Sequence, residues 1–400
     1  MRVLHHHDFR CLLIGQAAST IGDRIVFVAL ALYVTEIGSP TDVGIVLAAA
    51  TLPLVAFLLI GGVWADRLPR HRVMIVTDLI RFALHAVLAA LIFTGGIEIW
   101  QLVVIEALFG TAEAFFRPAY TGLVPQTVPE ELIQDAKAAG STIETVAEFA
   151  GPALATVLVL GLGAGWAFAL DALTFVVSAA FLTRVRPRER GEIPERRSLR
   201  AELREGYHEV RQRAWIWVTV AAFGVAVLLS FGPWTTLGPT IAEEDYGSTG
   251  VFGLLSVAMG AGTMLGAIVG FRWRPEHPMR VGFMWTLAWP AVTVGFALGL
   301  PLPLLVPLFA AAGVGLALFG IWWETALAER VPPHTLSRVS SYDWMGSLAL
   351  LPLGFLLAGP LGDALGPALV LGVGSALAVL VLAAAMVARE NWTLRRLEPA

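Results

Sequence analysis

Long apolar stretches separated by short polar gaps recur along the whole chain. Each is about 20 residues long or slightly more, which is the length that an α-helix needs to cross a bilayer. Lipid offers no hydrogen-bond partners to an open backbone, and the stretches are far too long for barrel strands, so we expect transmembrane helices. The twelve stretches lie near residues 11–35, 43–65, 73–94, 99–121, 138–160, 164–183, 214–238, 249–271, 281–299, 303–326, 339–359 and 366–388.

Basic residues are confined to alternate connections between these stretches. The gaps at 36–42, 95–98, 161–163, 239–248, 300–302 and 360–365 contain no Lys or Arg. Of the 27 basic residues, all but Arg24 and Arg81 lie in or beside the other connections and the two tails. Because cytoplasmic loops retain Lys and Arg, we expect a multi-pass protein of the inner (plasma) membrane with both termini in the cytoplasm.

A long basic connection divides the chain into two halves. It spans residues 184–213 and is expected to be a cytoplasmic linker between an N-terminal bundle of six helices (1–183) and a C-terminal bundle (214–400) with a short tail. Its stretch 196–207 has the pattern of an amphipathic surface helix, which is compatible both with a solvated linker and with attachment to anionic lipid. The fold class is therefore an all-α membrane protein with twelve transmembrane helices in two pseudo-symmetric six-helix bundles.

Composition excludes an ordinary soluble protein. The chain is 57% hydrophobic and 14% charged, with a mean hydropathy of +0.73, whereas soluble domains carry about 25% charged residues. Cys11 is the only cysteine, so an intramolecular disulfide and a cysteine-rich metal site are both excluded. The first apolar run is expected to be retained as a span, because no small-residue cleavage pattern follows it.

The gap at 61–72 is too short for a soluble domain and predicts a tight hairpin at the membrane surface. Its spacing resembles the loop signature between the second and third helices of the major facilitator superfamily. That resemblance implies the major facilitator fold and a gating role for the loop and for charged residues of the adjoining helices. The residues concerned are Gly62, Asp66, Arg67, Arg70 and Arg72 in the loop, with Asp78, Arg81 and Arg117 in the helices.

Further stretches resemble the drug and siderophore exporter branch of this superfamily, which includes macrolide-efflux and enterobactin-exporter proteins. The resemblance implies export of a small molecule, usually driven by protons moving inward. The span-five antiporter motif of the family is kept at Gly151-Pro152, while Ala147, Ala155 and Thr156 occupy its other glycine positions. The remaining stretches are Asp8-Phe9-Arg10, Ser19-x-x-Gly22-Asp23, Thr77-Asp78-Leu79-x-Arg81, Phe116-x-Pro118-Ala119 and Asp171-Ala172-x-Thr174-Phe175.

Several ionisable residues fall inside the predicted spans, where each costs a few kcal/mol and needs a reason. Asp78 lies three residues before Arg81, and Glu113 lies four before Arg117. Residues at these spacings share a helix face and can neutralise each other, so we expect structural or gating ion pairs.

Asp23 and Arg24 lie near the middle of the first span. Adjacent helical residues point about 100° apart, so these two cannot pair cleanly with each other. Each is expected either to find a partner on another helix or to face the central cavity.

Glu144 and Glu148 lie one turn apart on the fifth span. Two neighbouring carboxylates in a low dielectric resist double ionisation, so at least one is expected to keep its proton near neutral pH. This makes the pair a candidate for proton coupling. Alternatively, Arg81, Arg117 or Arg24 from another helix pairs with them permanently.

Other side chains at membrane depth leave two interpretations open. Glu106 and Asp171 are candidates to line one cavity, whereas His85 is expected to be a satisfied interior histidine rather than a proton relay. Most buried acids lie in the first half, which places the coupling chemistry there. The deep tryptophans of the second half form either a stacking wall for a bulky or cationic ligand or ordinary helix packing. They are Trp234, Trp289 and Trp322.

Motifs of nucleotide-binding proteins, zinc peptidases and serine hydrolases do not occur in the sequence. We therefore expect no enzyme activity, no cofactor, no metal site and no nucleic-acid partner. The predicted function is secondary active export of small hydrophobic or cationic compounds by proton-coupled antiport and alternating access. Its partners are a small-molecule substrate, protons and the lipid bilayer, and we expect a monomer. The alternatives are a dedicated siderophore exporter, a lysolipid transporter and a proton symporter for uptake.

Overall fold

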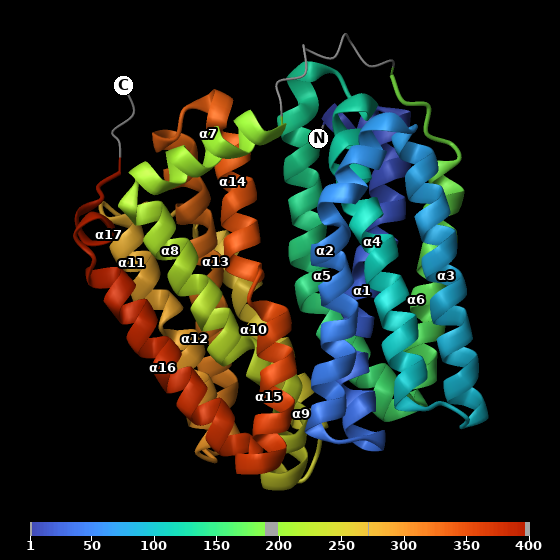
Figure 1. The fold of residues 1–400 in the computed structure, drawn as a ribbon, viewed down its shortest axis with the longest axis vertical. Helices are drawn as coiled ribbons and strands as arrows, with labels where there is room; N and C mark the ends of the chain where they lie inside the picture. The colour runs from blue at the N-terminus through green and yellow to red at the C-terminus, as the bar shows by residue number, and fades with distance from the viewer. Residues whose placement is uncertain (1, 189–198, 271, 397–400) are drawn as a thin grey trace. The chain divides into compact units, whose positions relative to one another are not determined.

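The computed structural model describes residues 2–188, 199–270 and 272–396. Within these residues the chain is almost wholly helical and contains no strand (Figure 1). It divides into two compact units, unit 1 (Met1–Ile193) and unit 2 (Pro194–Ala400). The predicted fold class of an all-α membrane protein with two helical bundles is confirmed.

Six long helices make up unit 1, and their ends follow local sequence signals. The Ser39 side chain accepts a hydrogen bond from the Asp42 amide while the Asp42 carboxylate accepts one from the Ser39 amide, which begins α2 with a capping box. Gly95, with φ of 67°, ends α3 in the left-handed conformation that glycine favours. The helices are α1 (His7–Ile37), α2 (Pro40–Arg67), α3 (Arg70–Thr94), α4 (Ile99–Thr127), α5 (Ile133–Leu162) and α6 (Ala164–Leu182).

Small residues allow the most extensive helix contact in unit 1, between α2 and α4. A β-carbon built on Gly61 would overlap the Ala114 carbonyl oxygen, and one built on Gly110 would overlap the Ala50 carbonyl oxygen. Because lipid provides no hydrophobic drive for association, such close backbone packing is what holds membrane helices together. The other main pairs are α1 with α5 and α6, and α3 with α4 and α6.

Unit 2 is built from shorter helical pieces. The amphipathic stretch predicted at 196–207 is represented by α7 (Leu199–Gln212), and residues 196–198 lie outside the described residues. The others are α8 (Ala214–Ala226), a π-helical turn (Val227–Phe231), α9 (Gly232–Tyr246), α10 (Gly250–Gly270), α11 (Pro278–Thr286), α12 (Ala288–Ala297), α13 (Leu302–Arg330), α14 (Pro333–Leu348), α15 (Leu351–Leu365), α16 (Pro367–Val387) and α17 (Arg389–Thr393).

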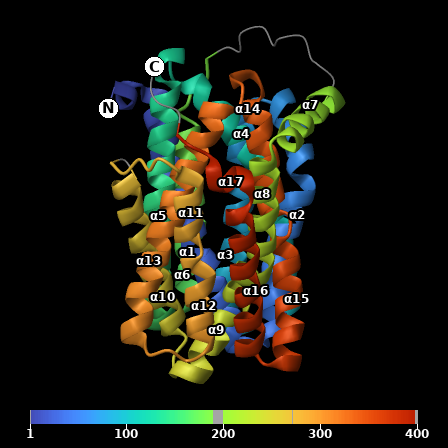
Figure 2. The same ribbon diagram turned by 90° about the vertical axis from the view of Figure 1, so that its left-hand side faces the viewer.

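Eleven helical stretches of the described chain are long and apolar enough to cross a membrane. The prediction of one continuous helix over 281–299 is wrong, because the chain breaks at Leu287 between α11 and α12. Pro290 has no amide hydrogen, so it cannot bond the Thr286 carbonyl and continue the ladder. Figure 2 shows α11 and α12 following one another along unit 2, where together they occupy the place of the ninth predicted span.

The pairings of unit 1 recur in unit 2. The α8–α9 span packs against α14–α15 and α16, as α1 packs against α5 and α6. The α11–α12 span packs against α13 and α16, as α3 packs against α4 and α6, and α10 packs against α13 as α2 does against α4. This correspondence supports the pseudo-symmetry of the two bundles.

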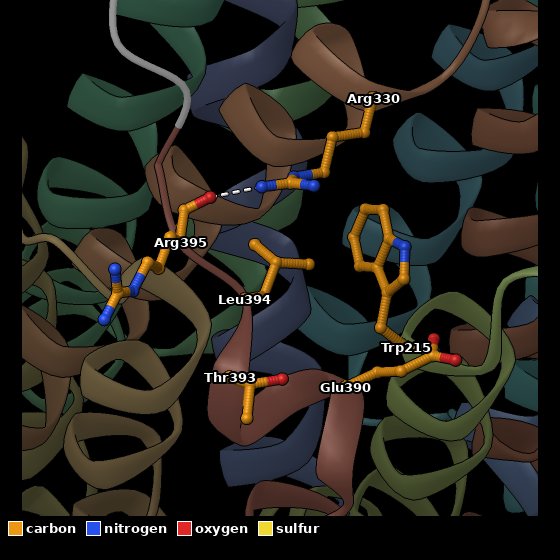
Figure 3. Close-up of a pocket in the computed structure, with 6 residues that line it drawn as sticks. All are labelled: Trp215, Arg330, Glu390, Thr393, Leu394 and Arg395. Carbon is orange, nitrogen blue, oxygen red and sulfur yellow. Dashed lines mark hydrogen bonds between the residues drawn. The ribbon is translucent and has the colours of Figure 1, made fainter.

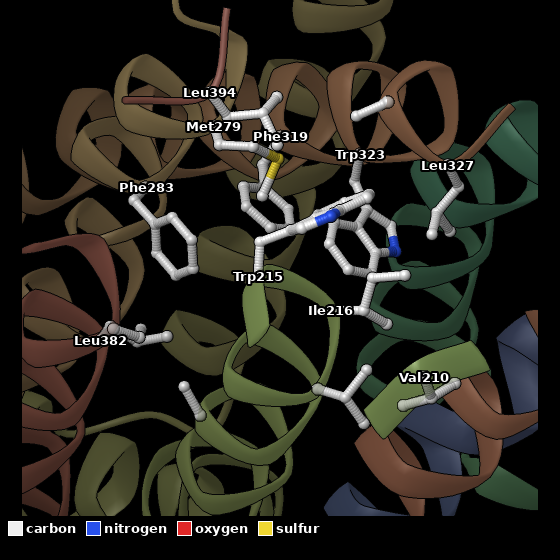
Figure 4. Close-up of a cluster of buried hydrophobic side chains, with 14 of the residues drawn as sticks. Val210, Trp215, Ile216, Met279, Phe283, Phe319, Trp323, Leu327, Leu382 and Leu394 are labelled. Atoms are coloured by element: carbon white, nitrogen blue, oxygen red, sulfur yellow. The ribbon is translucent and has the colours of Figure 1, made fainter. Parts of the chain in front are cut away.

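An aromatic core fills one end of unit 2 (Figure 4). Trp215 of α8 meets the edge of Trp323 of α13, with ring centroids 5.3 Å apart, and Phe319 stacks on the next turn of the same helix. Phe283 of α11 and Leu382 of α16 close this core. Four helices of unit 2 are thereby tied together at this end.

Candidate functional site

One face of α3 carries three ionisable side chains in register. Asp78, Arg81 and His85 lie three and four residues apart, and this spacing places them on the same side of the helix. All three are buried, and the helices packed on α3 are mainly α4 and α6. Ionisable groups therefore form a line through the interior of unit 1.

The Arg81 guanidinium is at the centre of the contacts made at the end of this line nearer the beginning of α3. It pairs with Asp78 on its own helix and lies 3.8 Å from Asp23 of α1. It also faces the rings of Phe116 and Phe175 at 4.0 and 4.4 Å, positions in which a cation is attracted to the ring face. Only 1% of the Arg81 side chain is exposed, so its charge depends on these neighbours.

His85 joins two acids from other helices. Its Nδ1 lies 2.5 Å from Asp171 Oδ2 of α6, and its Nε2 lies 3.8 Å from Glu106 Oε1 of α4. The imidazole ring stacks on Phe109 with centroids 4.2 Å apart. We call His85, Asp171 and Glu106 the His85 cluster. The structure thus brings Glu106 and Asp171 together, but around a histidine that the sequence analysis set aside.

The predicted contact within α4 is present. Arg117 donates from Nε and Nη2 to Glu113 Oε1 at 2.8 and 2.6 Å. The Arg117 side chain is 55% exposed, whereas Glu113 is mostly covered. This pair therefore differs from Asp78 and Arg81, which are both buried; the gating role of both pairs stays a prediction.

A second cross-helix ion pair joins α1 to α5. Arg24 Nη2 lies 3.2 Å from Glu148 Oε1, and both side chains are 44% exposed. Pairing of a span-five acid with an arginine from another helix was the alternative to proton coupling by these acids, and this contact is of that kind. Glu144, one turn earlier, is exposed and makes no ion pair or hydrogen bond with the side chains that the structure describes.

The span-five motif lies directly against this ion pair. A β-carbon on Gly151 would overlap the Arg24 side chain and come within 3.0 Å of the Arg24 backbone carbonyl carbon. Pro152 lies inside α5 on the next position. Glycine at 151 therefore allows α1 to approach α5 where Arg24 reaches Glu148.

The loop signature lies at the junction of α2 and α3. Gly62 and Asp66 are in the last turns of α2; the side chain of Asp66 lies outside the described residues. Arg67 ends α2, and Arg70 and Arg72 are in the first turn of α3. The Arg70 guanidinium donates to the Gly122 carbonyl of α4, so this end of α3 is fastened to α4.

The deep tryptophans of unit 2 take part in helix packing. Trp234 is buried among Phe252, Phe296 and Phe309, with ring centroids 4.9 to 5.2 Å away. Trp289 meets Trp234 edge to face, and the buried Trp322 donates through Nε1 to the Trp273 carbonyl at 3.2 Å. This placement favours packing over a wall that faces a ligand.

Sequence reasoning missed a buried hydroxyl cluster in unit 2. Ser230 of the π-helical turn, Thr293 of α12 and Ser375 of α16 lie within 2.8 to 3.3 Å of one another through their side-chain oxygens. Their spans correspond to α1, α3 and α6 of unit 1. Unit 2 therefore has neutral hydroxyls on the spans whose counterparts carry charges.

A pocket of about 400 Å³ opens at the end of unit 2 beside α17 (Figure 3). Trp215, Arg330 and Glu390 line it together with Thr393, Leu394 and Arg395, and the Arg330 guanidinium donates to the Arg395 carbonyl. It contains none of the predicted site residues. Its charged side chains already make contacts within the chain, since the Glu390 carboxylate also accepts a hydrogen bond from the Trp215 amide.

A multi-pass helical membrane protein with two matching units and a charged network buried in one of them has the architecture of a secondary transporter. The family model described as Major Facilitator Superfamily matches residues 12–347. The chain belongs to the major facilitator superfamily, as its loop signature indicated.

Two curated relatives align along most of the chain. Multidrug efflux pump Tap of Mycolicibacterium fortuitum is 28% identical over 374 residues, which cover 89% of this chain and 90% of that protein. Macrolide efflux protein A of Streptococcus pyogenes is 24% identical over 369 residues, covering 88% of each. The predicted resemblance to the exporter branch is confirmed.

A solved structure supports the fold alone. The bacterial homolog of the human lysosomal transporter Spinster, inward-facing and unoccupied, superposes with a TM-score of 0.72 at 16% sequence identity, over 98% of both chains. The chain is thus a membrane transporter in family and in fold.

Proposed function

We propose that the protein exports small hydrophobic or cationic compounds by proton-coupled antiport, with both termini in the cytoplasm of the inner membrane. Relatives named as efflux proteins over nearly the whole chain support export. The observation that carries proton coupling is the network of unit 1, in which four carboxyls surround one guanidinium and one imidazole. Arg81, His85, Asp78, Glu106 and Asp171 are buried, and the side chain of the fourth acid, Asp23, is 32% exposed.

The excess of carboxyls is what makes this network suited to protons. Arg81 can neutralise one carboxylate fully, and His85 can neutralise a second only when it is charged. Net charge at membrane depth is costly, so a network with more acids than cations is stabilised by taking up protons. Ion pairs with a purely structural role would need only as many carboxylates as cationic side chains.

A separate pair of acids is suited to the cargo. Glu144 and Glu148 lie one turn apart on α5 and are exposed, and the only basic group paired with them is Arg24, among the residues that the structure describes. A cationic compound can replace the Arg24 guanidinium at Glu148 while Glu144 adds a second negative charge. These two residues thus favour cationic cargo and remain candidates for coupling.

Gating belongs to the loop signature in this proposal. Arg70 fastens the beginning of α3 to α4 through the Gly122 carbonyl. Asp66 precedes Arg70 across the loop, in the last turn of α2. Breaking and remaking such contacts lets a bundle change its inclination during alternating access. The protein works as a monomer because one chain supplies both bundles.

Transport in liposomes tests the proposal. The purified protein is reconstituted, a pH gradient of either sign is imposed, and uptake of ethidium, tetraphenylphosphonium and erythromycin is followed. Antiport predicts accumulation on the side with more protons, and loss of that accumulation when nigericin collapses the gradient. Uptake that follows protons in the same direction would instead identify a symporter, and uptake that ignores the gradient contradicts proton coupling.

The acids of α5 provide a sharper test of cargo recognition. Glu144→Gln with Glu148→Gln is expected to weaken transport of ethidium and tetraphenylphosphonium more than that of a neutral compound, since the ion contacts are lost. Asp245→Asn, at an exposed position at the end of α9, is the matched control that removes a carboxylate elsewhere. Equal losses for cationic and neutral compounds would contradict the assignment.

A further inference from the structure

We propose that His85 is the group that carries the coupling proton, with Asp171 holding its ring and Glu106 exchanging the proton with it. This inference rests on the proposed proton-coupled function and names the site of that coupling. Within the network of unit 1, it assigns the proton to the His85 cluster rather than to Asp23 or Asp78 beside Arg81.

The contact with Asp171 selects which ring nitrogen can react. When Asp171 is ionised, its carboxylate only accepts hydrogen bonds, so in that state His85 Nδ1, at 2.5 Å from Asp171 Oδ2, carries the hydrogen and donates it. The other nitrogen, Nε2, is then the atom that gains or loses a proton, because the partner of one ring nitrogen fixes the state of the other. Asp171 is therefore a positioning residue.

The free nitrogen points to a second acid. His85 Nε2 and Glu106 Oε1 lie 3.8 Å apart, and neither atom makes a hydrogen bond within the described part of the chain. In the transfer, the Glu106 O–H bond breaks and an Nε2–H bond forms, giving a carboxylate and an imidazolium; the reverse step restores both neutral groups. The two buried polar atoms without partners lie closest to each other, and an approach of roughly 1 Å brings them within hydrogen-bond distance for the transfer.

Aromatic rings pack around the imidazole of His85. Phe109 stacks on the imidazole, and Phe168 and Phe175 approach it at 5.7 and 5.9 Å. No group of His, Cys, Asp or Glu side chains in the described residues is arranged to hold a metal ion.

The charged groups that face this cluster come from every helix packed around it. They are Asp78 and Arg81 on α3, Glu113 on α4, Asp171 on α6 and Asp23 on α1. Arg81 lies one turn from His85 on the same helix, about 6 Å along its axis. A proton on His85 therefore adds positive charge next to Arg81, whose guanidinium contacts Asp78 and Asp23.

A glycine couples the cluster to the first helix. A β-carbon on Gly22 of α1 would overlap Asp171 Oδ1 and come within 2.6 Å of Thr174 Oγ1. The α1 backbone thus lies directly against the carboxylate that holds His85, and Arg24 on the same turn of α1 contacts Glu148. Movement of α1 as Glu148 exchanges Arg24 for cargo would shift Asp171 and so change where the proton is held.

Solid-state NMR of the full-length protein in liposomes measures this protonation directly. With ¹⁵N-labelled histidine, the signal lost in His85→Asn identifies His85 in the wild type. We expect Nδ1 to remain protonated and Nε2 to gain and lose a proton between about pH 5 and pH 8. In Glu106→Gln, this change should shift along the pH axis. A His85 ring that keeps one protonation state over this whole pH range would overturn the proposal.

Transport measurements then separate coupling from folding. His85→Asn and Glu106→Gln are expected to lose ethidium accumulation driven by a pH gradient while ethidium exchange at equal pH continues. His208→Asn, on the exposed surface of α7, is the matched control and should keep both activities. Gradient-driven transport retained in His85→Asn, or equal loss of exchange in folded Glu106→Gln, would overturn the proposal.

The two proposals fail in different ways. Wild-type protein that ignores the pH gradient would contradict the proposed function, while the NMR titration would still decide whether His85 binds a proton. Gradient-driven transport by the wild type that persists in both cluster variants would contradict only this inference. If His85→Asn is not recovered as folded protein, Glu106→Gln decides the transport test.

Discussion

At the scale of single residues, Arg81 is the clearest case of a charge that needs its partners. It lies between Asp78 and Asp23 and against two aromatic rings, with almost no exposed surface. Removing one member of a buried pair leaves an uncompensated charge, which costs more than the pair itself contributes. The exposed Arg117 pays no such penalty, because water or lipid headgroups can replace its contact with Glu113.

Arg81→Met is therefore expected to destabilise the protein by about 3–5 kcal/mol, since Asp78 remains buried without its partner. Arg117→Met should cost about 1 kcal/mol or less. The double variant Asp78→Leu with Arg81→Met should recover much of the loss. Thermal unfolding of the detergent-solubilised variants measures all three. Equal midpoints for Arg81→Met and Arg117→Met would contradict the assigned difference in burial.

How much of the site can be predicted depends on where each partner lies in the chain. The contacts of Asp78 with Arg81 and of Glu113 with Arg117 follow from helix periodicity alone. The contacts of His85 with Asp171 and Glu106 depend on which helices are neighbours and how each is rotated, which no local pattern supplies. The available signal was the spacing of His85 from Arg81, which places it on the same charged face.

At the scale of helices, one glycine position recurs in both units. The sequence offset that separates Gln126-Thr127-Val128-Pro129 from Glu329-Arg330-Val331-Pro332 also separates Gly110 from Gly313. A β-carbon on Gly110 would overlap the Ala50 carbonyl oxygen across α2 and α4, and one on Gly313 would overlap the Met259 carbonyl oxygen across α10 and α13. The weak sequence repeat thus marks the same helix contact in both units.

Gly110→Ala and Gly313→Ala should each destabilise the protein by about 1–3 kcal/mol, because a carbonyl oxygen must move to make room. Gly320→Ala in α13 is the control, since its β-carbon would meet no atom within 4 Å. Thermal unfolding midpoints in detergent provide the comparison. A Gly110→Ala variant as stable as Gly320→Ala would show that this approach of α2 and α4 is not close in the protein.

The sequence predicted the helices well because hydrophobic length and charge alternation act locally along the chain. It failed where the backbone ladder itself is interrupted. The ninth span divides at Leu287, three residues before Pro290, which cannot donate a hydrogen bond. Residues 349–350 separate α14 from α15 before Pro352, but Val339–Leu365 is still one apolar stretch long enough to span. Hydropathy does not register a missing amide hydrogen, so a continuous run was expected.

At the scale of the whole chain, the two units share their packing but differ in their chemistry. Unit 1 has carboxyls, a guanidinium and an imidazole on α1, α3 and α6, where the corresponding spans of unit 2 carry Ser230, Thr293 and Ser375. Hydroxyls do not titrate near neutral pH, so they can hold helices together without binding a proton. Repetition of the fold therefore permits proton chemistry to be restricted to one unit.

Ser230→Ala with Ser375→Ala tests this division of roles. Each lost hydroxyl contact should cost about 0.6 kcal/mol, the average for hydrogen bonds between membrane helices. Thr293 keeps a partner, because its hydroxyl also donates to the Pro290 carbonyl at 2.9 Å. We expect a slightly lower unfolding midpoint and unchanged transport driven by a pH gradient, whereas Asp171→Asn should lose that transport. If the folded serine double variant also lost coupling, proton movement would require both units, and the restriction to unit 1 would be wrong.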